Sequence, residues 1–461
     1  MRSVGWLLVS HAAILVVGFA TVIALSRVGP EELGRWRFAQ ALLTYMLVAA
    51  DAGLSLLAIR DIASRRADAP RYAGPILVVR SAIATVLLAL AFVVLDPVAS
   101  RDQAAWFYMV MFLSVLPASL SLIHVLQGFE QMRAFALARL VTAAIGGVIG
   151  LGLFMATHNL ILLVVPVLVV GLLVDGVLLV VVWRKLGVQI RPGSLWLWLG
   201  LLRAGAPFLV GALAVQLVSN ADAIIIGTFR GEAELGFYVA AYVLAGQLLF
   251  LAAPVASAIY PRLSSLHGAG AGFDRAVGRV TGVLGLLVIP TCIGAAILAD
   301  EIVRLLYGDR YEGVATILTI LLGMPLVGYY NVAMGMALNA ARHQDLVART
   351  AILAAIVNVA LNLVLVTSMG LMGAAVAAVI TEVVTAAAYT WVARPIAGLT
   401  PLTEYVAPLP AALVMGLLVF SAVWIGVAIP VVVAFGAATY AILILVRPPA
   451  SMGAIRGVLR R

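Results

Sequence analysis

The chain has little charge and almost no cysteine. Only 11% of its 461 residues are Asp, Glu, Lys or Arg, and 64% are hydrophobic, whereas soluble domains carry about 25% charged residues. The single cysteine, Cys292, excludes an internal disulfide and a cysteine-based metal cluster. His11 and His124 lack ligand spacing to Cys, Glu or another His, so no metal site is predicted. This composition is typical of a polytopic membrane protein.

The sequence also lacks the signatures of an enzyme. No P-loop is present, so no built-in ATPase is predicted. No polar segment is long enough to hold a soluble catalytic domain, and the longest predicted outside stretch runs only from about Ala299 to Gly313. We therefore predict that the protein is not an enzyme. The net charge of +9 follows from the distribution of arginines among loops and does not indicate a nucleic-acid partner.

Apolar stretches long enough to cross about 30 Å of hydrocarbon recur along the whole chain. The fourteen predicted spans are residues 5–26, 37–59, 77–95, 105–126, 140–157, 160–182, 205–227, 237–259, 280–299, 314–338, 350–367, 371–392, 406–427 and 430–446. With the N-terminus in the cytoplasm, cytoplasmic segments hold 22 of the 29 Lys and Arg residues. The positive-inside rule therefore predicts a multi-pass protein of the cytoplasmic (inner) membrane with both termini in the cytoplasm.

A short motif occurs twice, 202 residues apart. Gly29-Pro-Glu-Glu-Leu-Gly34 recurs as Gly231-Glu-Ala-Glu-Leu-Gly236, and ten of the thirty-four positions between Gly29 and Ile62 are identical in the two copies. Because the offset covers six spans, an even number, the copies have the same orientation in the membrane. The sequence predicts an all-α polytopic membrane protein of about fourteen helices, with two six-helix lobes in a parallel pseudo-twofold arrangement plus two C-terminal helices.

The repeat also predicts the domain boundaries. Residues 1–183 form the N-lobe, and residues 184–203 form a cytoplasmic linker with an interfacial segment around Trp196 and Trp198. Residues 204–393 form the C-lobe, and residues 394–461 form the last two spans with a basic tail.

Four carboxylates fall inside predicted spans: Asp51, Asp175, Asp222 and Glu382. A charged group at the bilayer centre costs roughly 2.5–3.5 kcal/mol, so such a residue usually faces a cavity or a partner. Asp51, Asp222 and Glu382 are candidates for an ion-coupling site that binds H⁺ or Na⁺ in a water-filled lumen. The alternative is a carboxylate satisfied locally by capping or packing. No other cofactor is predicted.

Arginines recur at the predicted cytoplasmic helix ends, where a diphosphate head group would enter. Guanidinium groups bind phosphate oxygens bidentately, although topology alone also places arginine at these positions. Asparagines in the spans are candidates for binding sugar, with hydrogen bonding between helices as the alternative. The candidate substrate-binding residues are Arg60, Arg80, Arg139, Arg203, Arg262, Arg279, Arg349, Asn220 and Asn331.

Several loose motifs follow one another in a fixed order. They include the two Gly-x-x-Glu-Leu-Gly loops, the segment Asn220-Ala-Asp-Ala-Ile-Ile-Ile-Gly227 before the second loop, and Tyr260-Pro-Arg262. Further along come Leu305-Leu-Tyr-Gly-Asp-x-Tyr311, Asn358-x-x-x-Asn362 and Gly370-Leu-Met-Gly-Ala-Ala375, which runs on to Glu382. In order and spacing they resemble the polysaccharide-biosynthesis flippases of the multidrug/oligosaccharidyl-lipid/polysaccharide exporter superfamily, over nearly the whole chain.

This resemblance implies a function. Such flippases move a polyprenyl-diphosphate-linked oligosaccharide from the cytoplasmic to the outer leaflet by alternating access between two lobes, usually coupled to an ion gradient or membrane potential. The partners implied are the lipid-linked glycan and the lipid bilayer, with a polysaccharide polymerase and glycosyltransferases as possible protein partners. Fourteen spans are similar to the lipid II flippase subgroup, but that subgroup carries arginines in span 1, where this chain has only His11.

We therefore favour export of an O-antigen or exopolysaccharide unit. The alternatives are a cation-coupled multidrug exporter of the same superfamily, a lipid II flippase and, least favoured, a membrane glycosyltransferase or polymerase.

Overall fold

A computed structural model describes residues 2–99, 104–250, 252, 263–265, 271–397, 400–446 and 448, and these residues contain helices but no strand. Eleven helices are long and apolar enough to cross a membrane, or twelve if the bent pair Pro30–Asp51 and Leu54–Ser64 is one span. The shorter apolar helix Ala105–Leu120 and the helix Glu232–Phe250 fall on the two remaining predicted spans. The predicted all-α polytopic fold is thus confirmed.

The chain forms two compact units. Unit 1 comprises residues up to Gly227 together with Gly231–Gly236, and unit 2 comprises Thr228–Arg230 and the residues from Phe237 onward. The predicted lobe boundaries at residues 183 and 204 stay a prediction.

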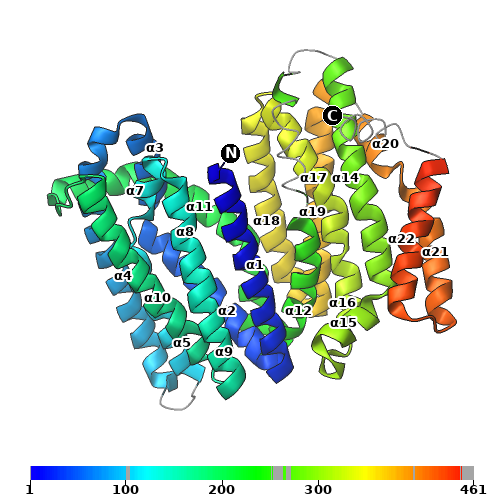
Figure 1. Cartoon of the computed structure of the whole chain (residues 1–461), viewed down its shortest axis with the longest axis horizontal. Coiled ribbons are helices and arrows are strands. Elements are labelled where there is room, and N and C mark those ends of the chain that lie inside the picture. Colours follow the sequence, from blue (N-terminus) through cyan, green and yellow to red (C-terminus); the bar gives the residue numbers. More distant parts are fainter. Residues whose placement is uncertain are drawn as a thin grey trace. The chain divides into compact units, whose positions relative to one another are not determined.

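The helices of unit 1 are short where the chain bends and long where it spans (Figure 1). They are α1 (Arg2–Val28), α2 (Pro30–Asp51), α3 (Leu54–Ser64), η1 (Arg66–Asp68), α4 (Ala69–Ala99), α5 (Ala104–Leu113), α6 (Val115–Leu120), α7 (Ile123–Gly128), α8 (Met132–Val141), the π-helical turn η2 (Thr142–Gly146), α9 (Gly147–Thr157), α10 (Ile161–Val180), the π-helical turn η3 (Val181–Lys185) and α11 (Leu195–Phe229), whose last residues enter unit 2.

Unit 2 takes in the end of α11 and, from Phe237 onward, the next helix. Its helices are α12 (Glu232–Phe250), α14 (Ala271–Ile297), α15 (Ala299–Tyr307), η4 (Asp309–Tyr311), α16 (Val314–Leu321), α17 (Gly323–Ala340), α18 (Gln344–Met369), α19 (Leu371–Ala397), α20 (Thr400–Val406), α21 (Leu409–Trp424) and α22 (Ile429–Val446). The last two helices pack side by side at the edge of this unit (Figure 1). Met415, Val419 and Val432 form a small core between them.

A break between α2 and α3 positions the polar residues of unit 1. Helix α2 begins with Pro30, whose fixed φ suits the first helical position. It ends where Ala52 and Gly53 adopt left-handed conformations, at φ 50° and 74°, and α3 continues at 48° to α2. A Cβ on Gly53 would lie only 2.3 Å from the carbonyl oxygen of Gly205 on α11. Glycine is therefore required here by both its conformation and its contact.

The predicted linker ends in a helix. Residues 195–203 are the first turns of α11, which runs unbroken to Phe229, and the interfacial position of this segment stays a prediction. The run Leu195–Leu202 is rich in leucine, a strong helix former, and contains no proline, so the helix can begin at Leu195; it also continues past Pro207. Trp196 is still 82% exposed, and the indole N–H of Trp198 donates to the carbonyl oxygen of Pro192 at 2.6 Å.

Candidate functional site

Two charged side chains of unit 1 meet at the break between α2 and α3. Arg80, on α4, is only 8% exposed, and its Nε lies 3.5 Å from Oδ1 of Asp51. Its Nη1 and Nη2 donate to the carbonyl oxygens of Ser121 (3.3 Å) and Ala118 (2.5 Å). Asp51 also accepts hydrogen bonds from the backbone N–H of Ser55, at 3.3 Å, and from its hydroxyl. The Asp51 carboxylate thus caps the first turn of α3 and is compensated by Arg80.

Two more titratable groups surround this pair. His124, on α7, is fully buried, and neither ring nitrogen has a hydrogen-bond partner among the described residues. Asp175, on α10, is hydrogen-bonded to Ser121 and interacts electrostatically with Arg80. Sequence reasoning left Asp175 out of the site, because only the packing of α10 against α6 brings it near Arg80. The signal that could have found it was a carboxylate inside a span without a basic residue one turn away.

The second buried polar site lies in unit 2. Asn331, on α17, donates through Nδ2 to Oε2 of Glu382 on α19 at 2.6 Å, and to the Glu382 carbonyl oxygen at 3.0 Å. Asn331 is 8% exposed, and its Oδ1 has no partner in the described part of the chain. No ion pair to Glu382 occurs among these residues. A predicted sugar-binding residue and a predicted ion-coupling residue are therefore neighbours, and the carboxylate has no cationic partner in the ranges that the structure describes.

Two more asparagines of unit 2 are buried on α18. Asn358 donates to the buried Thr381 hydroxyl at 3.3 Å and thereby links α18 to α19. Asn362 donates to the Asn358 carbonyl oxygen at 2.9 Å, within α18. Asn358 thus bridges two helices, which was the alternative to sugar binding.

The candidates on α11 are engaged locally within unit 1. Asn220 accepts a hydrogen bond from Nη1 of Arg37 at 3.0 Å and donates to Oε1 of Gln216 at 2.8 Å. Asp222 is 8% exposed and accepts the backbone N–H of Ala223 at 2.7 Å. Neither site role is tested by these contacts, and both stay predictions.

The remaining candidate arginines that the structure describes are exposed. Arg60 pairs with Asp61 at 2.6 Å and lies over the Phe208 ring, and Arg349 approaches Asp345 at 4.0 Å. Three exposed arginines have no carboxylate partner among the described residues: Arg139, Arg203 and Arg279. Arg262 lies outside the described residues. The structure therefore separates compensated from uncompensated arginines, which the sequence could not do.

The two copies of the repeated motif touch each other within unit 1. A Cβ on Gly34 would lie 1.7 Å from the carbonyl oxygen of Glu232, and a Cβ on Gly236 would lie 1.7 Å from that of Pro30. The contact is reciprocal, and only glycine permits it. Glu232 reinforces it by accepting Nε of Arg35 at 2.8 Å and the hydroxyl of Tyr108. The motif is thus a packing surface for its own second copy.

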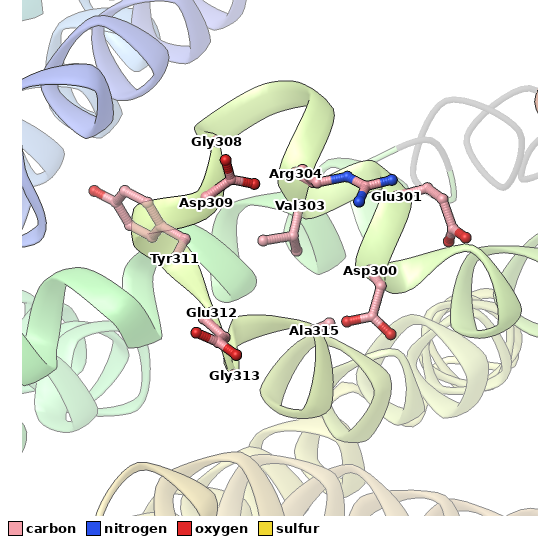
Figure 2. Close-up of a pocket in the computed structure, with 10 residues that line it drawn as sticks. All are labelled: Asp300, Glu301, Val303, Arg304, Gly308, Asp309, Tyr311, Glu312, Gly313 and Ala315. Carbon is pink, nitrogen blue, oxygen red and sulfur yellow. The ribbon is translucent and has the colours of Figure 1, made fainter.

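An acidic pocket of about 470 Å³ lies between α15, η4 and α16 in unit 2. Figure 2 shows the carboxylates of Asp300, Asp309 and Glu312 around it, with Arg304 on the same side as Glu301. No group of three potential metal ligands occurs in the part of the chain that the structure describes. Beside the pocket, burial raises the pKa of Tyr307, whose hydroxyl donates to the carbonyl oxygen of Ala240 at 3.1 Å.

Solved membrane proteins with many helices share this fold. The structure is similar to the lipid II flippase MurJ in an inward closed conformation, with a TM-score of 0.76 over 99% of each chain at 13% identity. It is also similar to an inward-facing multidrug resistance MATE family transporter of the MOP superfamily, with a TM-score of 0.62 over 86% of this chain and 95% of that chain at 16% identity. The family model described as "Polysaccharide biosynthesis protein" matches residues 1–267. The chain belongs to this family.

Curated relatives resemble parts of the chain. A probable low-salt glycan biosynthesis flippase, Agl15 of Haloferax volcanii, is 29% identical over 36% of each chain. The probable flippase AglR of the same organism is 28% identical over 34% of each chain. The chain thus spans about a third of the length of these two relatives. A putative O-antigen transporter of Escherichia coli is 25% identical over 65% of this chain and 73% of its own.

Proposed function

We propose that the protein moves a polyprenyl-diphosphate-linked oligosaccharide from the cytoplasmic to the outer leaflet of the cytoplasmic membrane by alternating access. The observation that carries this proposal is the polysaccharide-biosynthesis family match over residues 1–267. Similarity to a glycan biosynthesis flippase and a putative O-antigen transporter supports the substrate class. An O-antigen or exopolysaccharide unit remains the preferred glycan, and a polymerase and glycosyltransferases remain the candidate protein partners.

The diphosphate is bound first by uncompensated arginines. Arg139, Arg203 and Arg279 are exposed at predicted cytoplasmic helix ends, and none has a carboxylate partner among the described residues. A guanidinium already paired with a carboxylate must give up that partner before it binds phosphate, so Arg60, Arg80 and Arg349 are weaker candidates than these three. Arg139, Arg203 and Arg279 are therefore the preferred diphosphate ligands among the predicted arginines.

Glu382 couples transport to an ion. A carboxylate at membrane depth without a cationic partner is costly, and the half-buried Glu382 has only the neutral Asn331 amide as a described side-chain partner. A proton on Glu382, or Na⁺ between its carboxylate and the unpaired Oδ1 of Asn331, removes that cost. Asp51 does not share this property, because Arg80 already compensates it.

The reciprocal glycine contact closes one end of the transport path. Gly34 and Gly236 lie near the starts of α2 and α12. The charge distribution predicts that these two segments face outward. Release of the glycan to that side requires α2 and the start of α12 to separate, which breaks the glycine contact and the Arg35–Glu232 ion pair. Both interactions join two helices and are not part of the backbone hydrogen bonding of either, so they can break and re-form without unfolding a helix.

The test uses the purified full-length chain in liposomes that contain a fluorescent polyprenyl-diphosphate disaccharide. We expect the labelled glycan to become accessible to a membrane-impermeant glycosidase faster than in empty liposomes. A gene deletion should remove the surface polysaccharide and leave its lipid-linked precursor inside the cell. Accumulation of labelled drugs in the deletion strain, with intact surface polysaccharide, would instead support the second candidate, a cation-coupled multidrug exporter. The observation that favours this candidate is the uncompensated Glu382 carboxylate.

A further inference from the structure

An apolar groove of about 320 Å³ is lined by residues of α1 and α9 in unit 1. Each helix contributes one face to it, with residues spaced at i, i+3, i+4 and i+7, the spacing of neighbouring side chains on one side of a helix. On α1 these residues are Ala20, Ile23, Ala24 and Arg27, followed by Val28. On α9 they are Leu151, Phe154 and Met155, followed by the capping residue His158. The small side chains of Ala20 and Ala24 leave the groove open.

Both faces end in a nitrogen-bearing side chain. Arg27 lies in the last turn of α1, and His158 is the left-handed residue that caps α9, at φ 55°. Both are exposed, and both line the same groove. The groove therefore has an apolar wall and a cationic mouth at the end of the bundle that the charge distribution predicts to face outward.

Topology does not explain Arg27. It is one of the seven basic residues that the predicted orientation places outside. Others of this group are engaged: Arg35 with Glu31 and Glu232, Arg37 with Asn220. Arg27 has no hydrogen-bond or ion-pair partner in the described ranges of the chain. An unpaired guanidinium beside an apolar groove is complementary to a lipid that carries a phosphate.

We propose that this groove binds a long-chain prenyl diphosphate lipid in the outer leaflet, with the chain segment next to the phosphate in the groove and the phosphate oxygens on Arg27. A volume of about 320 Å³ is at the low end for ligand cavities and suits one narrow chain better than a two-chain phospholipid. His158 lies at the same mouth and is a second donor to the diphosphate. The lipid's identity rests on the proposed function, and the groove is then a binding position for the product after translocation.

The experiment measures lipid binding without transport. The full-length chain is reconstituted in liposomes with a photoreactive prenyl diphosphate that carries no glycan, and peptides that bear adducts are mapped by mass spectrometry. Arg27→Gln removes the phosphate ligand, and Ala24→Phe fills the groove. Arg304→Gln removes another predicted outer arginine, and Gly18→Phe adds the same ring to α1 where no atom lies within 4 Å.

We expect adducts on α1 and α9 in the wild-type protein. Arg27→Gln should lower the adduct yield at least about tenfold, which corresponds to the loss of one charge-assisted hydrogen bond. Ala24→Phe should lower the yield at least about tenfold as well, because it fills the groove. The two control variants should leave the yield unchanged. Unchanged adducts in Arg27→Gln and Ala24→Phe would overturn the proposal. So would equal adducts from photoreactive phosphatidylglycerol, which would assign the groove to ordinary phospholipid.

Thermal unfolding of each variant separates binding from stability. If Arg27 serves only to stabilise the C-terminal end of α1, Arg27→Gln will lower the melting temperature and leave the adducts in place, which overturns the proposal. If the protein forms adducts but moves no glycan, the lipid-binding groove is supported and the proposed function is rejected. If it moves glycan but forms no adducts, the proposed function is supported and the lipid-binding groove is rejected.

Discussion

The two units treat a membrane carboxylate in opposite ways. In unit 1, Asp51 lies 3.5 Å from an arginine and accepts two hydrogen bonds from Ser55. In unit 2, the Glu382 carboxylate accepts a hydrogen bond from the neutral amide of Asn331, and no cation pairs with this carboxylate in the described structure. A compensated carboxylate can remain charged in every state of a transport cycle, whereas an uncompensated one must gain and lose a cation. Two carboxylates that were equal candidates in the sequence are thus compensated by a cation in unit 1 and, among the described residues, uncompensated in unit 2.

Among the tests of this difference between the two units, Arg80→Ala should have the largest effect. It leaves Asp51 without its cation and the carbonyl oxygens of Ser121 and Ala118 without their donor. Removing one partner of a buried ion pair costs about 3–5 kcal/mol, so we expect a strongly lowered melting temperature in detergent. The double variant Arg80→Ala/Asp51→Asn should recover part of the loss. Arg203→Ala, at an exposed site, is the control, and an unchanged melting temperature for Arg80→Ala would refute the role of the pair.

Glu382→Gln sharpens the comparison from the other side. Glutamine keeps an oxygen for the Asn331 amide but cannot take up a proton or bind Na⁺ as a carboxylate does. We expect normal folding and at least about a tenfold loss of gradient-driven glycan flipping, which corresponds to about 1.4 kcal/mol. Asp345→Asn, which neutralises an exposed carboxylate of unit 2, should be fully active. Full activity of Glu382→Gln would remove this residue from the coupling mechanism.

Asp51→Asn should have a much smaller effect on transport. The amide oxygen can still accept from Ser55 and lie next to Arg80. We expect a loss of about 1 kcal/mol in stability and less than about a threefold loss of flipping rate. The same liposome assay measures both carboxylate variants side by side. If Asp51→Asn abolishes flipping in a folded protein, the two carboxylates are equivalent and the comparison fails.

The smallest effect extends the comparison to the surface arginines. Arg139 has no carboxylate partner among the described residues, whereas Arg349 has Asp345 at 4.0 Å. Arg139→Gln should raise the KM for the lipid-linked glycan about threefold, or about 0.7 kcal/mol, and Arg349→Gln should leave it unchanged. Equal KM values for the two variants would show that compensation does not select the substrate-binding arginines.

Much of the fold followed from local sequence. The span count depends on runs of apolar residues, and twelve spans plus Ala105–Leu120 and α12 lie where those runs predicted them. Helix α11 begins at Leu195, before the predicted span 205–227, because the helix-forming run around Trp196 and Trp198 is uninterrupted; the interfacial position of these tryptophans stays a prediction. The candidate site was predicted only as a set of residue types. Asp51 and Arg80 are 29 positions apart and Asn331 and Glu382 are 51 apart, so no sequence period connects them.

The sequence by itself determined that the protein is polytopic, where its spans lie and that one motif occurs twice, because hydropathy and repetition are properties of the chain. Tertiary packing decided which polar groups satisfy one another. It joined Arg80 to Asp51, left Glu382 with an amide, and brought Gly34 and Gly236 into a reciprocal backbone contact. The physical reason is that a polar group in a membrane takes its partner from whichever helix lies next to it, and neighbouring helices are chosen by side-chain packing over the whole bundle.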